Sequence, residues 1–113
     1  MRVIMGLETD VAEGAAKCAT ANQRRYALFR VGGKVYCLEN QCTHLGGPLC
    51  EGSLHGSIVQ CPWHGSRFDV TSGSVVGPPA RKPVPSYPVA IEDGKIGSYR
   101  VRLGISFKYE GGD

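Results

Sequence analysis

The sequence predicts an all-β domain built from packed antiparallel sheets. Short apolar runs are separated by turn residues along all 113 residues, which include 16 glycines and 7 prolines. No stretch has the apolar periodicity of a long amphipathic helix. Gly32-Gly33 and Thr71-Ser72-Gly73 each lie between two strand-like runs, which is typical of β-hairpins. The chain is therefore expected to fold as sheets stacked on one another.

The first part of the chain contains four predicted strands. They cover residues 2–5, 15–20, 25–31 and 34–39. Gly32-Gly33 joins the last two of them as a two-residue hairpin loop.

Shorter strands and turns follow. Strands are predicted at residues 58–60, 66–70, 74–76, 89–91 and 96–103, and turns at residues 54–57, 71–73 and 92–95. Residues 105–109 alternate between apolar and polar, which predicts an edge strand or a partner-binding tail, and residues 111–113 are expected to fray. The segment 77–88 holds five of the prolines and must run extended, because proline cannot donate a ladder hydrogen bond.

Length and composition fit one compact domain over residues 1–113. The formal charge of +3 is small and the basic residues form no run, so a nucleic-acid partner has little support. Arg24-Arg25 and Arg81-Lys82 are most simply solvated surface. No signal peptide is recognisable near Met1, and no apolar run is long enough to span a membrane. A cytoplasmic protein without a membrane partner is expected.

Two stretches each pair one cysteine with one histidine. Cys42-Thr43-His44 is followed, after sixteen residues, by Cys61-Pro62-Trp63-His64. Two thiols and two imidazoles suit either a zinc ion or an iron–sulfur cluster with mixed ligands. Each stretch has the order Cys then His, and the glycines and prolines nearby argue against the helix of a zinc finger. Such turn-rich loops can direct backbone N–H groups toward sulfur and so stabilise a cluster.

These stretches resemble the paired motifs of the Rieske proteins, CxHxG and CPxHG followed by Ser. The matching segments are Cys42-Thr-His-Leu-Gly-Gly-Pro48, Cys61-Pro-Trp-His-Gly-Ser66, Arg67-Phe-Asp69 and Gly77-Pro-Pro-Ala80. The resemblance implies a Rieske-like fold with cluster-binding loops at about 42–48 and 61–66, and with a proline loop at about 77–80 that closes over the cluster. It implies one [2Fe-2S] cluster per chain, in which Cys42 and Cys61 bind one iron, and His44 and His64 bind the other.

The same resemblance implies a set of residues around the cluster. They are Leu45, Gly46, Trp63, Gly65, Ser66, Phe68 and Pro79. Among the apolar ones, Leu45, Trp63 and Pro79, together with Pro48, are candidates for a collar that shields the cluster and touches partners.

Charge predicts the electron affinity of such a centre. With two thiolates and two neutral imidazoles the oxidised cluster is neutral, so its reduction potential falls at about −150 to +300 mV, against about −400 mV for clusters with four cysteines. Loss of the outer imidazole protons in the oxidised state couples reduction to proton uptake at alkaline pH.

Departures from one branch of the family refine this expectation. High-potential Rieske proteins carry two further cysteines that form a disulfide, and Gly47 and Trp63 stand at those positions here. They also carry a Tyr that donates to a cysteine sulfur, where this chain has Phe68, although the serine donor is kept as Ser66. A potential in the lower half of the mixed-ligand range is therefore expected.

The remaining cysteines and the third histidine receive no metal role. Cys18, Cys37 and Cys50 have no motif spacing and are interpreted as reduced thiols, with Cys37 packed as a small apolar residue in a strand. Cys50 lies close to the first ligand loop in sequence, but it is not expected to be a ligand. His55 is interpreted as an exposed, unbound turn residue.

The sequence argues against a complete oxygenase and against a dinucleotide-binding reductase, which leaves an electron carrier. A Rieske oxygenase also needs an iron held by two His and a carboxylate, and only His55 remains. There is no GxG, which excludes a GxGxxG dinucleotide-binding fingerprint. The leading hypothesis is a soluble Rieske ferredoxin that takes one electron from a NAD(P)H-dependent flavoprotein reductase and passes it, through the exposed edges of His44 and His64, to a terminal ring-hydroxylating oxygenase.

Two alternatives stay open from the sequence. One is the small subunit of an assimilatory nitrite reductase, whose relatives resemble this length and fold. The other is a zinc-stabilised interaction module without a redox role. A carrier and a zinc module differ in colour, because only the iron–sulfur protein absorbs visible light.

Overall fold

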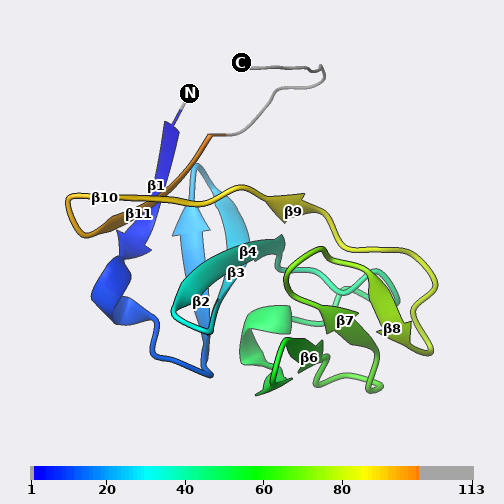
Figure 1. The fold of residues 1–113 in the computed structure, drawn as a ribbon. Coiled ribbons are helices and arrows are strands. Elements are labelled where there is room, and N and C mark those ends of the chain that lie inside the picture. Colours follow the sequence, from blue (N-terminus) through cyan, green and yellow to red (C-terminus); the bar gives the residue numbers. More distant parts are fainter. Residues whose placement is uncertain (1, 100–113) are drawn as a thin grey trace.

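The computed structural model of the chain describes residues 2–99 and has three antiparallel sheets (Figure 1). The first has the order β1 (Arg2–Leu7), β11 (Lys95–Tyr99), β10 (Ala90–Glu92). The second has the order β2 (Ala16–Ala21), β3 (Arg24–Val31), β4 (Lys34–Glu39), β9 (Ser86–Tyr87). The third has the order β5 (Ser53–His55), β6 (Ile58–Gln60), β7 (Arg67–Asp69), β8 (Val75–Gly77).

The helical content of the described residues is limited to two short 3₁₀ turns. They are η1 (Glu8–Asp10) and η2 (Leu49–Glu51). Among residues 2–99, no helix has the length and hydrophobicity needed to cross a membrane. The prediction of an all-β fold with antiparallel sheets is confirmed.

Strand β3 explains why the sheets stack, because it is buried on both faces. Successive side chains of a strand point to opposite sides. Tyr26 and Leu28 enter one core cluster, which includes Met5 and Ile96 of the first sheet. The alternate residues of β3 enter the other core cluster, which includes residues of the third sheet; these are Ala27 and Phe29, packed with Val59 and Phe68. The second sheet therefore lies between the other two, as Figure 1 shows for β1 and β11 on one side and β6, β7 and β8 on the other.

The hairpin predicted at Gly32-Gly33 is present. Both glycines have positive φ, +61° and +81°, which suits the two-residue loop between Val31 and Lys34. The Glu13 carboxylate accepts hydrogen bonds from both glycine N–H groups, at 2.7 and 2.8 Å. This contact fixes the loop against the segment before β2.

One predicted turn and the predicted proline-rich arm each contain a short strand. Residues 53–55 form β5, so only residues 56–57 make the turn to β6. The reason is burial: Leu54 pairs with Val59 and packs against the core. Within the proline-rich segment, β9 pairs with Cys37 and Leu38 of β4. The predicted strand 105–109, the end of strand 96–103 and the tail 111–113 lie outside the described residues.

The interpretation of Cys18 and Cys50 as reduced thiols is wrong. These residues form a disulfide, with Cα atoms 4.8 Å apart and a sequence separation of 32 residues. The bond joins β2 to η2, which follows the first ligand loop. Their proximity depends on packing between distant segments, which cysteine spacing does not reveal. Cys37 is not disulfide-bonded and is buried, as predicted, with its Sγ 3.6 Å from the Sδ of Met5.

Candidate metal centre

The first predicted ligand loop is a tight turn closed by two backbone hydrogen bonds. The Cys42 amide donates to the Gly47 carbonyl at 2.9 Å, and the Gly46 amide donates to the Cys42 carbonyl at 2.8 Å. Gly46 has a φ of +81°, a conformation that favours glycine. At the base of the loop, the buried Asn40 accepts from the amides of Leu49 and Cys50, through its carbonyl and its Oδ1, each at 2.8 Å.

The second loop repeats this conformation. The Cys61 amide donates to the Ser66 carbonyl at 2.7 Å, and the Gly65 amide donates to the Cys61 carbonyl at 3.3 Å. Gly65 also has a φ of +81° and stands four residues after its cysteine, as Gly46 does. The two loops therefore share the same pair of closing hydrogen bonds and the same glycine position, although their sequences share only the cysteine and this glycine.

The histidines occupy different positions in these two loops. Trp63 stands where the first loop has His44, and Leu45 stands where the second has His64. Even so, the ring centres of the two imidazoles are 5.2 Å apart and their planes are nearly perpendicular, at 88°. The exposed fractions of Leu45 and Trp63 are 59% and 50%. The loops thus present two exposed imidazoles together with two exposed apolar side chains.

The two thiols are buried, in contrast to the imidazoles. Cys42 and Cys61 are each only 3% exposed. The backbone amides of His44 and Trp63 donate to their sulfurs, each at 3.5 Å. Burial raises the pKa of the Cys61 thiol, the neighbouring Cys42 adds to the rise, and the Trp63 amide opposes it. Without a metal the Cys61 thiol is therefore held protonated, and a metal that binds there displaces the proton.

The donor set of Cys42, His44, Cys61 and His64, two thiols and two imidazoles, suits a [2Fe-2S] cluster with mixed ligands. A separate group of metal-ligating side chains within residues 2–99 is Cys18, Cys50 and Glu51, whose ligand atoms lie within 4.8 Å of one another, but both of its sulfurs are in the disulfide.

The proline-rich segment lies across both loops. The Ala80 amide donates to the Oγ of the buried Ser66 at 3.0 Å, and the Thr43 Oγ1 donates to the carbonyl of Lys82 at 2.7 Å. One contact ties the segment to the second loop and the other ties it to the first. We call the surface formed by residues 42–48, 61–66 and 77–82 the loop tip.

The other residues singled out from the sequence have varied surroundings. Phe68 is fully buried in β7, and Pro79 is exposed, whereas Pro48 is half-buried. A Cβ atom at Gly47 would lie 2.6 Å from the Cys61 sulfur and 3.0 Å from Trp63 Cγ, so these loops approach closely at the two positions that carry cysteines in high-potential relatives. His55 is exposed, as expected, at the end of β5.

Sequence reasoning missed three contributors to the site: Asn40, Thr43 and Lys82. Asn40 precedes the first loop and carries no motif. Thr43 lies inside the CxH motif, but its contact with Lys82 spans 39 residues, and no sequence signal pairs the two.

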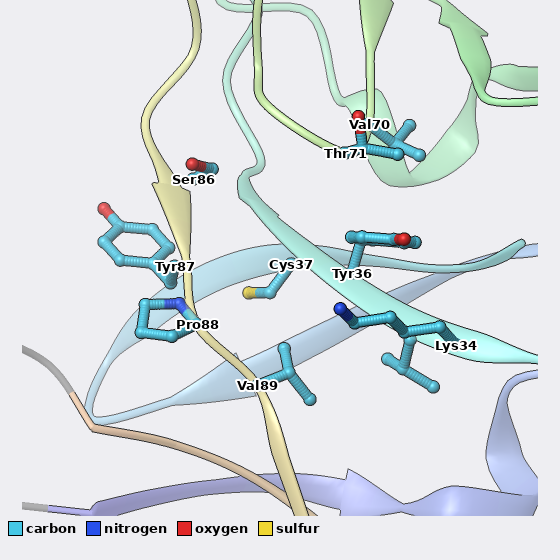
Figure 2. A pocket seen from close by; sticks show the side chains of 10 residues that line it. Lys34, Tyr36, Cys37, Val70, Thr71, Ser86, Tyr87, Pro88 and Val89 are labelled. Carbon is cyan, nitrogen blue, oxygen red and sulfur yellow. The ribbon is translucent and has the colours of Figure 1, made fainter.

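Surface hollows lie both at the loop tip and away from it. One, of about 440 Å³, lies beside His44 and is lined by Thr43 and residues 79–82. A second, of about 490 Å³, lies beside Trp63. Figure 2 shows the third, of about 420 Å³, between β4 residues such as Tyr36 and Cys37 and the segment 86–89. This third hollow contains none of the four metal-ligand candidates.

Comparison with known proteins identifies the family. A family model described as the Rieske [2Fe-2S] domain matches residues 1–88. The chain is 36% identical to the ferredoxin component of the naphthalene 1,2-dioxygenase/salicylate 5-hydroxylase systems of Ralstonia sp. The match covers 77% of this chain and 84% of that protein.

Comparison with solved structures points to the same family. The Sphingomonas yanoikuyae B1 ferredoxin matches with a TM-score of 0.84 and 30% identity, over 88% of this chain and 99% of that one. A structure described as a complex of reduced oxygenase and oxidised ferredoxin in carbazole 1,9a-dioxygenase matches with a TM-score of 0.79 and 28% identity, over 86% and 91% of the two chains. The protein therefore belongs to the Rieske [2Fe-2S] family, among the ferredoxins of oxygenase systems.

Proposed function

We propose that Cys42 and Cys61 bind one iron of the [2Fe-2S] cluster and that His44 and His64 bind the other. The observation that supports this most is the arrangement of the donors: two buried thiols and two neighbouring exposed imidazoles lie on two loops closed by the same pattern of backbone hydrogen bonds. When bound, the cluster supplies reversible one-electron chemistry. The chain supplies amides directed at both sulfurs, and exposed imidazole edges that bring the centre to the surface.

The protein carries single electrons from a NAD(P)H-dependent flavoprotein reductase to a terminal ring-hydroxylating oxygenase. Two observations support this route. The relatives described as ferredoxin components belong to dioxygenase systems, and one similar ferredoxin is described in complex with its oxygenase. The loop tip also offers Leu45 and Trp63 as exposed apolar contacts around the imidazoles. A cytoplasmic location follows from the proposed donor, because NAD(P)H is supplied there.

The alternatives are less well supported. The family match disfavours a zinc module. A nitrite reductase subunit would share the fold, but the ferredoxin relatives span most of this chain and are named for dioxygenase systems.

A two-step kinetic experiment tests this route. Holoprotein is mixed anaerobically with NADH and a flavoprotein reductase from a ring-hydroxylating dioxygenase system, and then with the terminal oxygenase of that system. Bleaching of the visible absorbance in the first step and its recovery in the second are expected. A cluster that dithionite reduces but that exchanges electrons with neither protein, across several such systems, would contradict the proposed route.

A further inference from the structure

The loop tip carries positive charge and no negative charge. Its three segments, 42–48, 61–66 and 77–82, contain Arg81 and Lys82 and no Asp or Glu. Both basic residues are exposed and line the hollow of about 440 Å³ beside His44. The surface next to a proposed electron exit is thus cationic.

The backbone holds this basic pair in place. Ala80, just before the pair, is buried and donates to Ser66, and the Lys82 carbonyl accepts from Thr43. Further along, the buried Val84 donates its amide to the Gly73 carbonyl at 2.8 Å. The segment is therefore anchored on both sides of Arg81 and Lys82, and a partner that binds there has little backbone to immobilise.

The charges of the pair are available, unlike those of the other basic pair. Arg24 forms an ion pair with Glu39 at 2.6 Å, and the Arg25 guanidinium lies 3.7 Å from the Cys50 sulfur. Within residues 2–99, no ion pair or side-chain hydrogen bond involves the guanidinium of Arg81 or the ammonium of Lys82. Exposed charges of this kind steer association more than they stabilise a fold.

We propose that the hollow beside His44 is a docking site for an acidic surface of the redox partner, whose carboxylates pair with Arg81 and Lys82. Pro79, which is exposed at the rim of the hollow, is the apolar residue against which that surface packs. This inference rests on the proposed electron-transfer function, since it assigns the chemistry of the partner at the same tip. Docking of this kind predicts that the rate of association with the partner falls as the salt concentration rises. Salt screens the attraction between exposed charges over about 10 Å at 0.1 M.

Charged probes test this site without a natural partner. Holoprotein is reduced with dithionite, and its oxidation is followed with anionic ferricyanide and with cationic tris(phenanthroline)cobalt(III), each of which takes one electron. Three proteins are compared: wild type, Arg81→Gln/Lys82→Gln, and Lys17→Gln/Lys95→Gln. The last double variant removes the same net charge from exposed positions on β2 and β11. In parallel, binding of fluorescein-labelled hexaglutamate is measured by anisotropy, a readout independent of electron transfer.

At low ionic strength, the Arg81/Lys82 variant should slow oxidation by ferricyanide by about tenfold and weaken hexaglutamate binding, while oxidation by the cobalt complex is faster. The Lys17/Lys95 variant should change these quantities much less. Equal effects of the two double variants would overturn the proposal. They would show that the net charge of the protein, and not the position of Arg81 and Lys82, explains the attraction. Saturable competition by inorganic phosphate at constant ionic strength, with no preference for the peptide, would also overturn it in favour of a small-anion site.

The two proposals fail separately. A protein that assembles no cluster refutes the electron-transfer function, and hexaglutamate binding still reports on the basic pair. A protein with an intact cluster spectrum and no discrimination between the probes refutes only the docking site.

Discussion

The imidazole rings of His44 and His64 meet edge to face, with centres 5.2 Å apart, although they stand at different positions of two loops closed by the same backbone hydrogen bonds. His64 reaches this place with a φ of +125°, which is rare for a residue other than glycine. Neutral imidazoles at these positions determine the charge of the proposed centre.

Replacing either imidazole by a thiolate should lower the reduction potential. His44→Cys or His64→Cys adds one negative charge to the oxidised centre, and a shift of about 100 mV or more toward the four-cysteine range is expected. Spectroelectrochemical titration measures it. The matched control is His55→Ala, at an exposed histidine outside the ligand loops, which should leave the potential unchanged. An unchanged potential in a ligand variant that keeps its cluster would contradict the ligand assignment.

Ser66 is expected to act on both potential and stability. Its Oγ accepts from the Ala80 amide, so its hydroxyl proton remains available to donate toward a cluster sulfur. Ser66→Ala removes that donor and leaves a buried amide unsatisfied. The potential should fall, and the free energy of unfolding should drop by about 1–3 kcal/mol. Redox titration and chemical denaturation of the holoprotein measure the two effects. A loss of stability with an unchanged potential would limit Ser66 to holding the proline segment.

Phe68 stands where we expect this chain to lack a hydrogen bond to the proposed cluster. It is fully buried in β7, two residues after Ser66. Phe68→Tyr adds a hydroxyl that can donate toward a cysteine sulfur and should raise the potential by about 50 mV. A shift of that size is slightly less than a tenfold change in the equilibrium constant of a one-electron couple, for which a factor of ten is about 59 mV. Phe68→Leu, which adds no donor, is the control. A wild-type potential near the positive end of the mixed-ligand range would contradict the premise that a donor is missing.

The disulfide should stabilise the fold without being needed for the cluster. Closing a loop with a separation of 32 residues contributes about 3–4 kcal/mol by the chain-entropy estimate. Cys18→Ser/Cys50→Ser should lose about that much in urea denaturation and keep the visible spectrum of the wild type. Cys37→Ser should also keep that spectrum. Loss of the cluster in any of these variants would show that the cysteines outside the motifs are needed to assemble it.

The fold was predictable where local chemistry decides it. Gly32-Gly33 specifies a tight hairpin by backbone conformation alone, and the strands around it follow. The misses arose from tertiary contacts. Residues 53–55 form a strand because Leu54 reaches the core, and residues 86–87 form one because β4 offers an unpaired edge. Neither contact leaves a periodic pattern in so short a segment.

The two loops of the site were predictable and their supports were not. The cysteine and histidine spacing predicts the four proposed donors, and turn glycines predict the loops that carry them. The contact of Thr43 with Lys82, the anchoring of the first loop by Asn40, and the disulfide all join segments brought together only by the packed sheets. Such pairs depend on the three-dimensional arrangement and have no signature in a single sequence.

Electron paramagnetic resonance of the purified protein after dithionite reduction tests the central claim most directly, with iron, zinc and acid-labile sulfide assayed on the same sample. About two iron atoms and two sulfides per chain, with the low average g value of a histidine-ligated [2Fe-2S] cluster, are the predicted result. Stoichiometric zinc, no sulfide and no signal would contradict the assignment of Cys42, His44, Cys61 and His64 to an electron-carrying cluster.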